Sequence, residues 1–299
     1  EYFGRKSSDM LYYKPVAATN GYTSIPMNVG SMTNSGVEVD LNVNVLKIGS
    51  FNWDVNANAT FLKNKINELH PELNGKLIDG TRVYEEGESM YRLRLVEWAG
   101  VDEATGAPQW WAEDAEGKRV KTDDYQTAQA YKVDTEDLLP TVYGGFGTQI
   151  DFFGFDASVA FAYQLGGKIY DSGYQALMHG GSDMGRNLHK DSRNAWTPEN
   201  TKTDVPALDY GNTYVNATST RFLVSSNYLS LNNITFGYTV PKDLTRKLYL
   251  ESVRVYFAAD NVALWTKREG LDPRQSYVKS TTSLYTPIRT VSGGVKITF

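Results

Sequence analysis

The fold is decided by the stretch Ser35–Leu62, which reads SGVEVDLNVNVLKIGSFNWDVNANATFL. Apolar and polar residues alternate over Val37–Val45 and again over Phe51–Phe61, and the break Lys47–Ser50 separates the two runs. A period of two predicts two β-strands, each with one apolar face and one polar face. Both runs are about twice as long as an average strand of a soluble protein, which has about five or six residues.

The length of the second run is that of a membrane-spanning strand. From Phe51 to Phe61, a strand that rises about 3.3 Å per residue and tilts by about 40° climbs roughly 25 Å, the height of the lipid-facing band of an outer-membrane barrel. The polar face carries amides and carboxylates, which suit a water-filled interior. On this hairpin alone, the alternative is a large soluble β-sandwich.

Composition narrows the class of protein. The chain has 299 residues, of which 41% are hydrophobic, and its mean hydropathy is -0.43. The absence of a run of about 18 apolar residues excludes a helical membrane protein but not a barrel, whose strands are half polar. The net charge of -5 argues against a nucleic acid partner. Cysteine is absent, which excludes disulfides and thiolate metal sites.

The same alternation predicts further strands along the chain. A tight turn at Phe153-Gly154 joins two of them, and slipped alternation at Leu231–Ile234 indicates a bulge. The first residues read as the end of a strand already under way, which favours the back part of a longer polypeptide. The strands expected outside the first hairpin are Glu1–Tyr13, Thr141–Phe152, Phe155–Gln164, Asn227–Val240, Glu251–Trp265 and Val291–Phe299.

The lengths of the connections test the barrel hypothesis. They alternate between long and short along the chain, as expected of an antiparallel barrel with short periplasmic turns and long extracellular loops. The pattern predicts about eight strands. The last strand follows a long extracellular loop and runs towards the periplasm, so Phe299 is expected at the periplasmic rim. The short connections are Lys47–Ser50, Phe153–Gly154 and Pro241–Leu250. The long ones are Pro15–Asn34, Lys63–Leu139, Leu165–Thr220 and Thr266–Ile288.

Ordered blocks of sequence then point to a family. Val295, Ile297 and Phe299 resemble the terminal signal by which outer-membrane barrels are recognised for assembly. The remaining blocks are Asn34–Glu38, Gly87-Glu88, Trp98–Asp102, Thr105-Gly106, Tyr143–Phe146, Trp196–Asn200, Asn227–Pro241, Val253–Phe257, Asp260-Asn261, Thr266-Lys267 and Gly270–Pro273. In this order, and over nearly the whole chain, they are similar to the C-terminal part of SusC/RagA-type TonB-dependent outer-membrane transporters.

The resemblance implies an all-β fold, in which residues 1–299 form roughly the last third of a 22-stranded antiparallel transmembrane barrel. It also implies import of glycans or peptides across the bacterial outer membrane, together with a SusD-like surface lipoprotein. The family's plug domain and TonB box are not in this sequence, so coupling to TonB would run through the missing N-terminal part. No catalytic or cofactor-binding arrangement stands out, and we expect no enzyme activity.

Loop aromatics are the candidate binding residues. Trp98, Trp110, Trp111 and Trp196 could stack on a substrate or contact the lipoprotein, and the alternative is that they form the cores of the long loops. The many acidic loop residues could hold a structural Ca²⁺ through their oxygens, or simply face solvent. A metal pair from His179 and His189 would need further ligands, and ordinary loop histidines are the simpler interpretation.

Two other functions remain open on the residues. A self-contained eight-stranded barrel could act as an adhesin or anchor, but such a barrel is filled by bulky inward side chains. The inward face here carries small amides, which favour a wide lumen: Asn42, Asn44, Asn52, Asn56 and Asn58. The second alternative is a non-transporting SusC-like subunit of a larger outer-membrane assembly.

Overall fold

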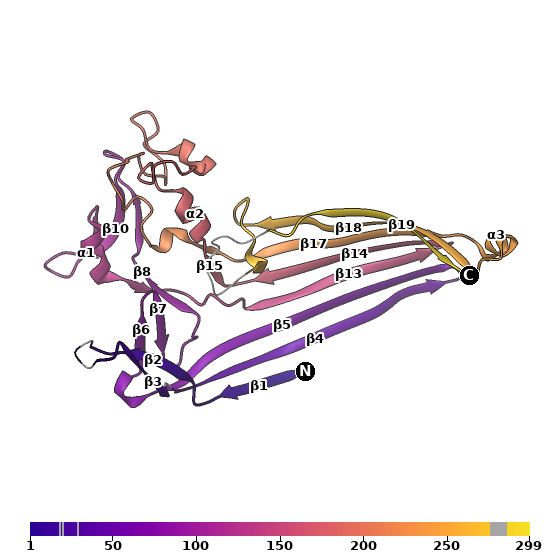
Figure 1. Cartoon of the computed structure of the whole chain (residues 1–299), viewed down its shortest axis with the longest axis horizontal. Coiled ribbons are helices and arrows are strands. Elements are labelled where there is room, and N and C mark those ends of the chain that lie inside the picture. The colour runs from indigo at the N-terminus through magenta and orange to yellow at the C-terminus, as the bar shows by residue number, and fades with distance from the viewer. Residues whose placement is uncertain (18, 20, 29, 276–285) are drawn as a thin grey trace.

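A computed structural model describes residues 1–17, 19, 21–28, 30–275 and 286–299. Eight antiparallel strands form one curved sheet in the order β1-β4-β5-β13-β14-β17-β18-β19, with β1 and β19 at its two edges (Figure 1). This confirms the predicted barrel segment of about eight strands. The strands are β1 (Tyr2–Ser7), β4 (Gly30–Ile48), β5 (Phe51–Leu69), β13 (Val142–Phe152), β14 (Phe155–Leu165), β17 (Tyr228–Thr239), β18 (Ser252–Thr266) and β19 (Thr290–Thr298).

The hairpin β4–β5 is longer than the alternation in the sequence indicates. Each strand has 19 residues, so β4 begins within the predicted loop Pro15–Asn34 and β5 runs seven residues into the predicted loop Lys63–Leu139. Beyond Leu62 both faces of β5 carry polar residues, because Asn64 turns inward and is buried beneath the outer loops. The hydrophobic pattern therefore ends before the strand does.

The N-terminal residues form two elements rather than the single predicted strand Glu1–Tyr13. Only β1 joins the large sheet, and β2 (Leu11–Pro15) pairs with β3 (Ser24–Asn28) in a separate hairpin. Asp9 lies between β1 and β2 with a φ of 56°, a left-handed conformation that ends the first strand. The predicted loop Pro15–Asn34 thus contains β3 and the start of β4.

The second half of the sheet agrees with the sequence prediction. The turn between β13 and β14 lies at Phe153-Gly154, where both residues have positive φ angles of 47° and 85°. Pairing of β17 shifts between Leu231 and Asn233, which confirms the predicted bulge. The short connection Pro241–Leu250 folds into α3 (Lys242–Thr245) and the 3-10 turn η6 (Arg246–Leu248). The predicted loop Thr266–Ile288 lies partly outside the described residues.

Two long connections gather at one end of the sheet, opposite α3 (Figure 1). We call residues 70–141 the first outer loop and residues 166–227 the second outer loop. The first contains η2 (Pro71–Leu73), β6 (Lys76–Asp79), β7 (Arg82–Glu85), β8 (Arg92–Leu95), β9 (Trp98–Val101), β10 (Pro108–Glu113), β11 (Arg119–Thr122), α1 (Tyr125–Ala128), η3 (Gln129–Tyr131) and β12 (Val133–Asp134). The second contains β15 (Lys168–Tyr170), α2 (Ser172–Leu177), η4 (Lys190–Asn194), η5 (Thr220–Phe222) and β16 (Leu223–Ser225). The turn η7 (Pro273–Gln275) follows β18.

The two faces of the sheet differ in chemistry. Outward-facing apolar side chains remain exposed from β4 to β19, and Leu41, Phe236 and Val295 keep 53%, 49% and 60% of their surface. Soluble monomers rarely expose such a continuous apolar face, whereas a lipid-facing barrel wall must. Among the described helices, none has the length and apolarity needed to span a membrane.

Candidate functional site

The two outer loops are joined through short backbone contacts. Val96 forms an isolated parallel bridge with Ser219, and the Thr220 N–H donates to the Val96 carbonyl at 2.9 Å. The Trp98 N–H donates to the Thr220 hydroxyl at 3.0 Å. These bonds join residues more than 120 positions apart, so the candidate tryptophans of both loops belong to one folded body above the sheet.

Trp110 forms the core of the first outer loop. It is 1% exposed and packs with the fully buried Val96 and Ala128, while Tyr125 meets its ring edge-on at a centroid distance of 5.1 Å. Asp124 accepts a hydrogen bond from the Gln126 N–H and so caps the start of α1. Trp110 therefore belongs to the core of the loop, which is the alternative given above to contact with a substrate or the lipoprotein.

Trp98 lies beside Trp110 and is covered by a cation. The two indoles meet edge-on at 6.1 Å, and the Arg221 guanidinium stands 4.8 Å above the Trp98 ring. Burial lowers the pKa of Arg221 to about 10, which leaves it charged at neutral pH. Arg221 also donates to the Val215 carbonyl at 3.0 Å. Trp98 is consequently part of the seam between the loops.

Trp196 fastens the second outer loop to a turn of the first. Its indole N–H donates to the Glu103 carbonyl at 3.0 Å. The ring also packs against Gly106, which has a φ of +75° and no room for a Cβ atom. The turn is closed by Asp102, whose carboxylate accepts hydrogen bonds from Thr105, and these bonds lower the pKa of Asp102.

Trp111 occupies the opposite face of β10 from Trp110 and remains partly exposed. The Arg119 guanidinium lies 4.1 Å from its ring centroid, and the Lys121 amine lies 5.7 Å from it. Arg119 in turn pairs with Glu97 at 2.6 Å. Of the four candidate tryptophans, Trp111 thus presents a surface that combines a ring with positive charge.

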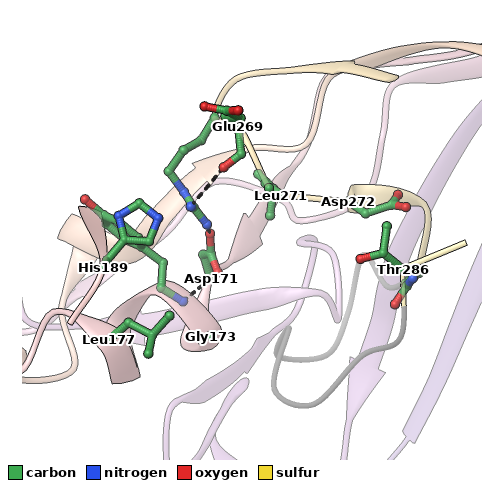
Figure 2. A pocket seen from close by; sticks show the side chains of 12 residues that line it. Asp171, Gly173, Leu177, His189, Glu269, Leu271, Asp272 and Thr286 are labelled. Carbon is green, nitrogen blue, oxygen red and sulfur yellow. Dashed lines mark hydrogen bonds and ion pairs between the residues drawn. The ribbon is translucent and has the colours of Figure 1, made fainter. Parts of the chain in front are cut away.

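A further cluster, not foreseen from the sequence, lies between the second outer loop and the chain after β18 (Figure 2). Asp171 caps α2 by accepting from the Tyr174 N–H at 3.0 Å and forms an ion pair with Arg268. Arg268 stacks 4.2 Å above the Tyr174 ring, whose hydroxyl donates to Asp191. Burial raises the pKa of Tyr174 to about 12.

This cluster borders a cavity of about 320 Å³. His189 meets Tyr174 edge-on at 4.7 Å, and Lys190 forms an ion pair with Glu269 nearby. The contacts hold the end of β18 against the second outer loop. Gly270–Pro273 is one of the sequence blocks that resemble the family, but nothing in the sequence indicates that the neighbouring Arg268 pairs with Asp171, 97 positions earlier.

The inward face of the sheet is a polar wall. The Asn44 amide donates to Asn52 at 2.7 Å and to Asp54 at 2.8 Å, and the Gly145 N–H donates to Asn58 at 2.9 Å. Towards the α3 end, Arg254 reaches across the side-chain-free Gly237 to pair with Asp156. Amides and charges line this face as predicted, which suits a water-filled interior.

The remaining predicted residues are placed as follows. Val295 and Ile297 lie outward on β19, and Phe299 is 89% exposed. Their role in assembly stays a prediction.

Each histidine caps a loop through Nδ1: His70, His179 and His189 accept backbone N–H groups two to four residues onward. Within the described residues, no three His, Cys, Asp or Glu side chains gather closely enough to hold a metal ion, and the Ca²⁺ prediction stays untested.

Comparison with known proteins shows which receptors the chain resembles. No family model matches the chain. It is 26% identical over its whole length to TonB-dependent receptor P3 of Formosa agariphila, and 26% identical over 90% of its length to TonB-dependent receptor SusC of Bacteroides thetaiotaomicron. These alignments cover 32% and 27% of the two relatives, so the chain spans about a third of their length.

Solved structures give the same result. The RagAB peptide transporter superposes on the entire chain with a TM-score of 0.84 and 28% identity, and the match covers 33% of that chain. The RagAB peptide importer in its closed-closed state gives a TM-score of 0.82 and 27% identity over 33% of its length. The resemblance in sequence motifs is therefore confirmed: the chain is similar over its whole length to about a third of a SusC/RagA-type TonB-dependent receptor, and its fold matches a segment of the RagAB β-barrel.

Proposed function

We propose that the protein imports a nutrient across the bacterial outer membrane in a TonB-dependent manner. The observation that carries this proposal is the two-faced wall, whose outward face is apolar and exposed and whose inward face is lined by hydrogen-bonded amides and carboxylates. An outer-membrane barrel with an aqueous interior has this construction. Similarity to TonB-dependent receptors, SusC among them, supports TonB as the source of energy.

A SusD-like surface lipoprotein is the proposed partner. The outer loops supply a folded surface at one end of the wall, where binding residues are usually found. Within it, Trp111 is the tryptophan best placed for contact, because Trp98 and Trp110 are used in packing and Trp196 fastens the loops together. An aromatic ring flanked by arginine is a common element of protein interfaces.

The proposed substrate is a peptide or a glycan. RagAB is described as a peptide transporter, and the similarity to it supports a peptide. The outer loops also enclose an open polar groove of about 800 Å³. Its lining offers amides, hydroxyls and charges of both signs, which can bind either class of polymer: Glu103, Asn194, Asn200, Thr201, Lys202, Thr203 and Asp204. No enzymatic step is proposed.

Growth and uptake by a strain that carries the full-length receptor test this function. Deletion of the gene should abolish growth on the cognate peptide or glycan as sole nutrient, and the intact gene should restore it. Loss of TonB should have the same effect as the deletion. Normal uptake in the deletion strain, or uptake that continues without TonB, would contradict the proposal.

The same strain distinguishes the two alternative functions. An adhesin or anchor predicts lost surface attachment with normal nutrient uptake, and a non-transporting subunit predicts a defective assembly with normal uptake. In the described residues β1 and β19 lie at opposite edges of the sheet and do not pair with each other, which argues against a small closed barrel.

A further inference from the structure

Three lysines form a patch on the outward face of the sheet, just beyond its apolar band. Lys6 of β1 and Lys65 of β5 both flank Thr33 of β4, and Lys63 lies two residues before Lys65. Strands lie about 4.8 Å apart and residues rise about 3.3 Å each, so the patch is roughly 10 Å across. In Figure 1, β1, β4 and β5 form the lower edge of the sheet.

The register fixes the direction of these side chains. Tyr2, Val37 and Phe61 are aligned across the same three strands and expose 74%, 43% and 47% of their surface on the lipid-facing side. Side chains two and four residues along a strand share a face, so Lys63 and Lys65 point the same way as Phe61. The intervening Asn64 and Ile66 are buried on the other side.

The lysine amines are free of internal partners. Within the described part of the chain, none of the three takes part in an ion pair or a side-chain hydrogen bond. Thr33 and Asn67, which share their face, are hydrogen-bonded to each other at 2.9 Å and add neutral donors. Glu68, the nearest acid along β5, is engaged by the Ser31 hydroxyl.

The depth of the patch matches the headgroup layer of a membrane. With a tilt of about 40°, Lys63 stands about 5 Å beyond Phe61, and Lys65 stands about 10 Å beyond it. The polar layer of a bilayer extends roughly 5–7 Å beyond the hydrocarbon on each side. Lysine stems are flexible and can bend towards it. On the neighbouring strands β13 and β14, Val142 and Leu165 are in register with Phe61, and this row of apolar residues marks the edge of the band beyond which the lysines lie.

We propose that Lys6, Lys63 and Lys65 bind the phosphate groups of anionic lipid headgroups in the outer leaflet. At this depth the lysine ammonium groups can contact lipid phosphates without first breaking an ion pair inside the protein. Lipid headgroups also always surround the outward face of a barrel that spans a membrane. The site fixes the rotation and height of this part of the barrel relative to the leaflet. It lies on the outside of the wall and is independent of substrate passage.

The test uses the full-length receptor in detergent, titrated with bisphosphorylated lipid A, and bound lipid is counted by native mass spectrometry. The variant combines Lys6→Gln, Lys63→Gln and Lys65→Gln. A lysine near an anionic surface contributes about a fivefold gain in binding, so the triple change should weaken binding about 100-fold. The control combines Lys118→Gln, Lys242→Gln and Lys247→Gln, which removes the same charge elsewhere and should bind normally.

Dephosphorylated lipid A separates phosphate recognition from general lipid contact. The proposal predicts that it binds weakly and equally to the wild-type receptor and to the triple variant. It also predicts that raising the salt concentration weakens binding of phosphorylated lipid by the wild type more than by the variant. Equal binding of phosphorylated lipid by wild type and variant, or an equal loss in the control, would overturn the proposal. Nutrient uptake by the variant reports separately on the transport function.

Discussion

Because the outward face of the eight-stranded sheet is apolar and its inward face is polar, a charged side chain should destabilise the barrel much more on the outward face than on the inward face. Leu41 on β4 points outward, is 53% exposed and is paired with Ala57 of β5. Asn42, its neighbour, points inward and is paired with Asn56. We predict that Leu41→Lys prevents stable insertion, whereas Asn42→Lys is tolerated, although the two changes add the same charge at adjacent positions.

The size of the effect follows from depth. Leu41 lies four residues from Val37, so it stands about 10 Å below the outer rim of a band that is roughly 25 Å tall. A lysine near the middle of the lipid-facing band costs about 2–4 kcal/mol, and one near the interface costs about 0–1 kcal/mol. Leu41→Lys should therefore lower the ratio of folded to unfolded receptor about 30- to 700-fold. Val37→Lys should cost much less.

The measurement is urea-induced unfolding of the full-length receptor in lipid vesicles, followed by the heat-modifiable folded fraction on gels. The expected order of stability is wild type, Asn42→Lys, Val37→Lys and Leu41→Lys. Equal losses for Leu41→Lys and Asn42→Lys would refute the assignment of the two faces. Equal losses for Leu41→Lys and Val37→Lys would refute the depth argument alone.

Four further predictions concern the loops and the last strand. Trp110→Ala should destabilise the first outer loop by about 3–5 kcal/mol, seen as faster proteolysis, whereas Trp111→Ala should keep the fold and weaken capture of a surface lipoprotein in pull-downs. Deletion of Phe299 should lower the yield of assembled barrel without changing its urea midpoint, and a normal yield would reduce Phe299 to a lipid-facing side chain. Hydrogen bonds from Thr105 lower the pKa of Asp102, so their contribution to stability is complete above the ordinary value near 3.9 and is lost as pH falls through the lowered pKa. Protection of this turn against hydrogen exchange, taken relative to the intrinsic exchange rate at each pH, should therefore decrease at low pH, and Asp102→Asn should remove that dependence.

The strands of the wall could be predicted because their chemistry repeats at a period of two. Over Val37–Val45 and Phe51–Phe61, lipid requires apolar side chains on one face and the lumen requires polar side chains on the other. Apolar and polar residues therefore alternate in the sequence. The prediction failed where that contrast disappears. Beyond Leu62 the outward face becomes polar at Lys63 and Lys65, while the inward face mixes the buried Asn64 with the buried Ile66. The apolar-outward alternation ends there, and seven residues of the strand were therefore predicted to be loop.

The candidate site was predicted less completely than the wall. The sequence identified the tryptophans but not their separate roles, which depend on pairing between the outer loops: Arg221 covers Trp98, and Glu103 holds Trp196. The ion pair between Asp171 and Arg268 joins residues 97 positions apart, and local patterns carry no information about such contacts. Only the fold brings them together.

The central claim is that this chain is a barrel wall between lipid and an aqueous lumen, and accessibility along β4 tests it most directly. Single cysteines at successive positions of Glu38–Asn44 would be introduced into a cysteine-free full-length receptor and exposed to a water-soluble maleimide in outer-membrane vesicles. The account predicts labelling at the even positions, which face the lumen, and protection at Val39, Leu41 and Val43. Uniform labelling, or labelling that favours the odd positions, would contradict it.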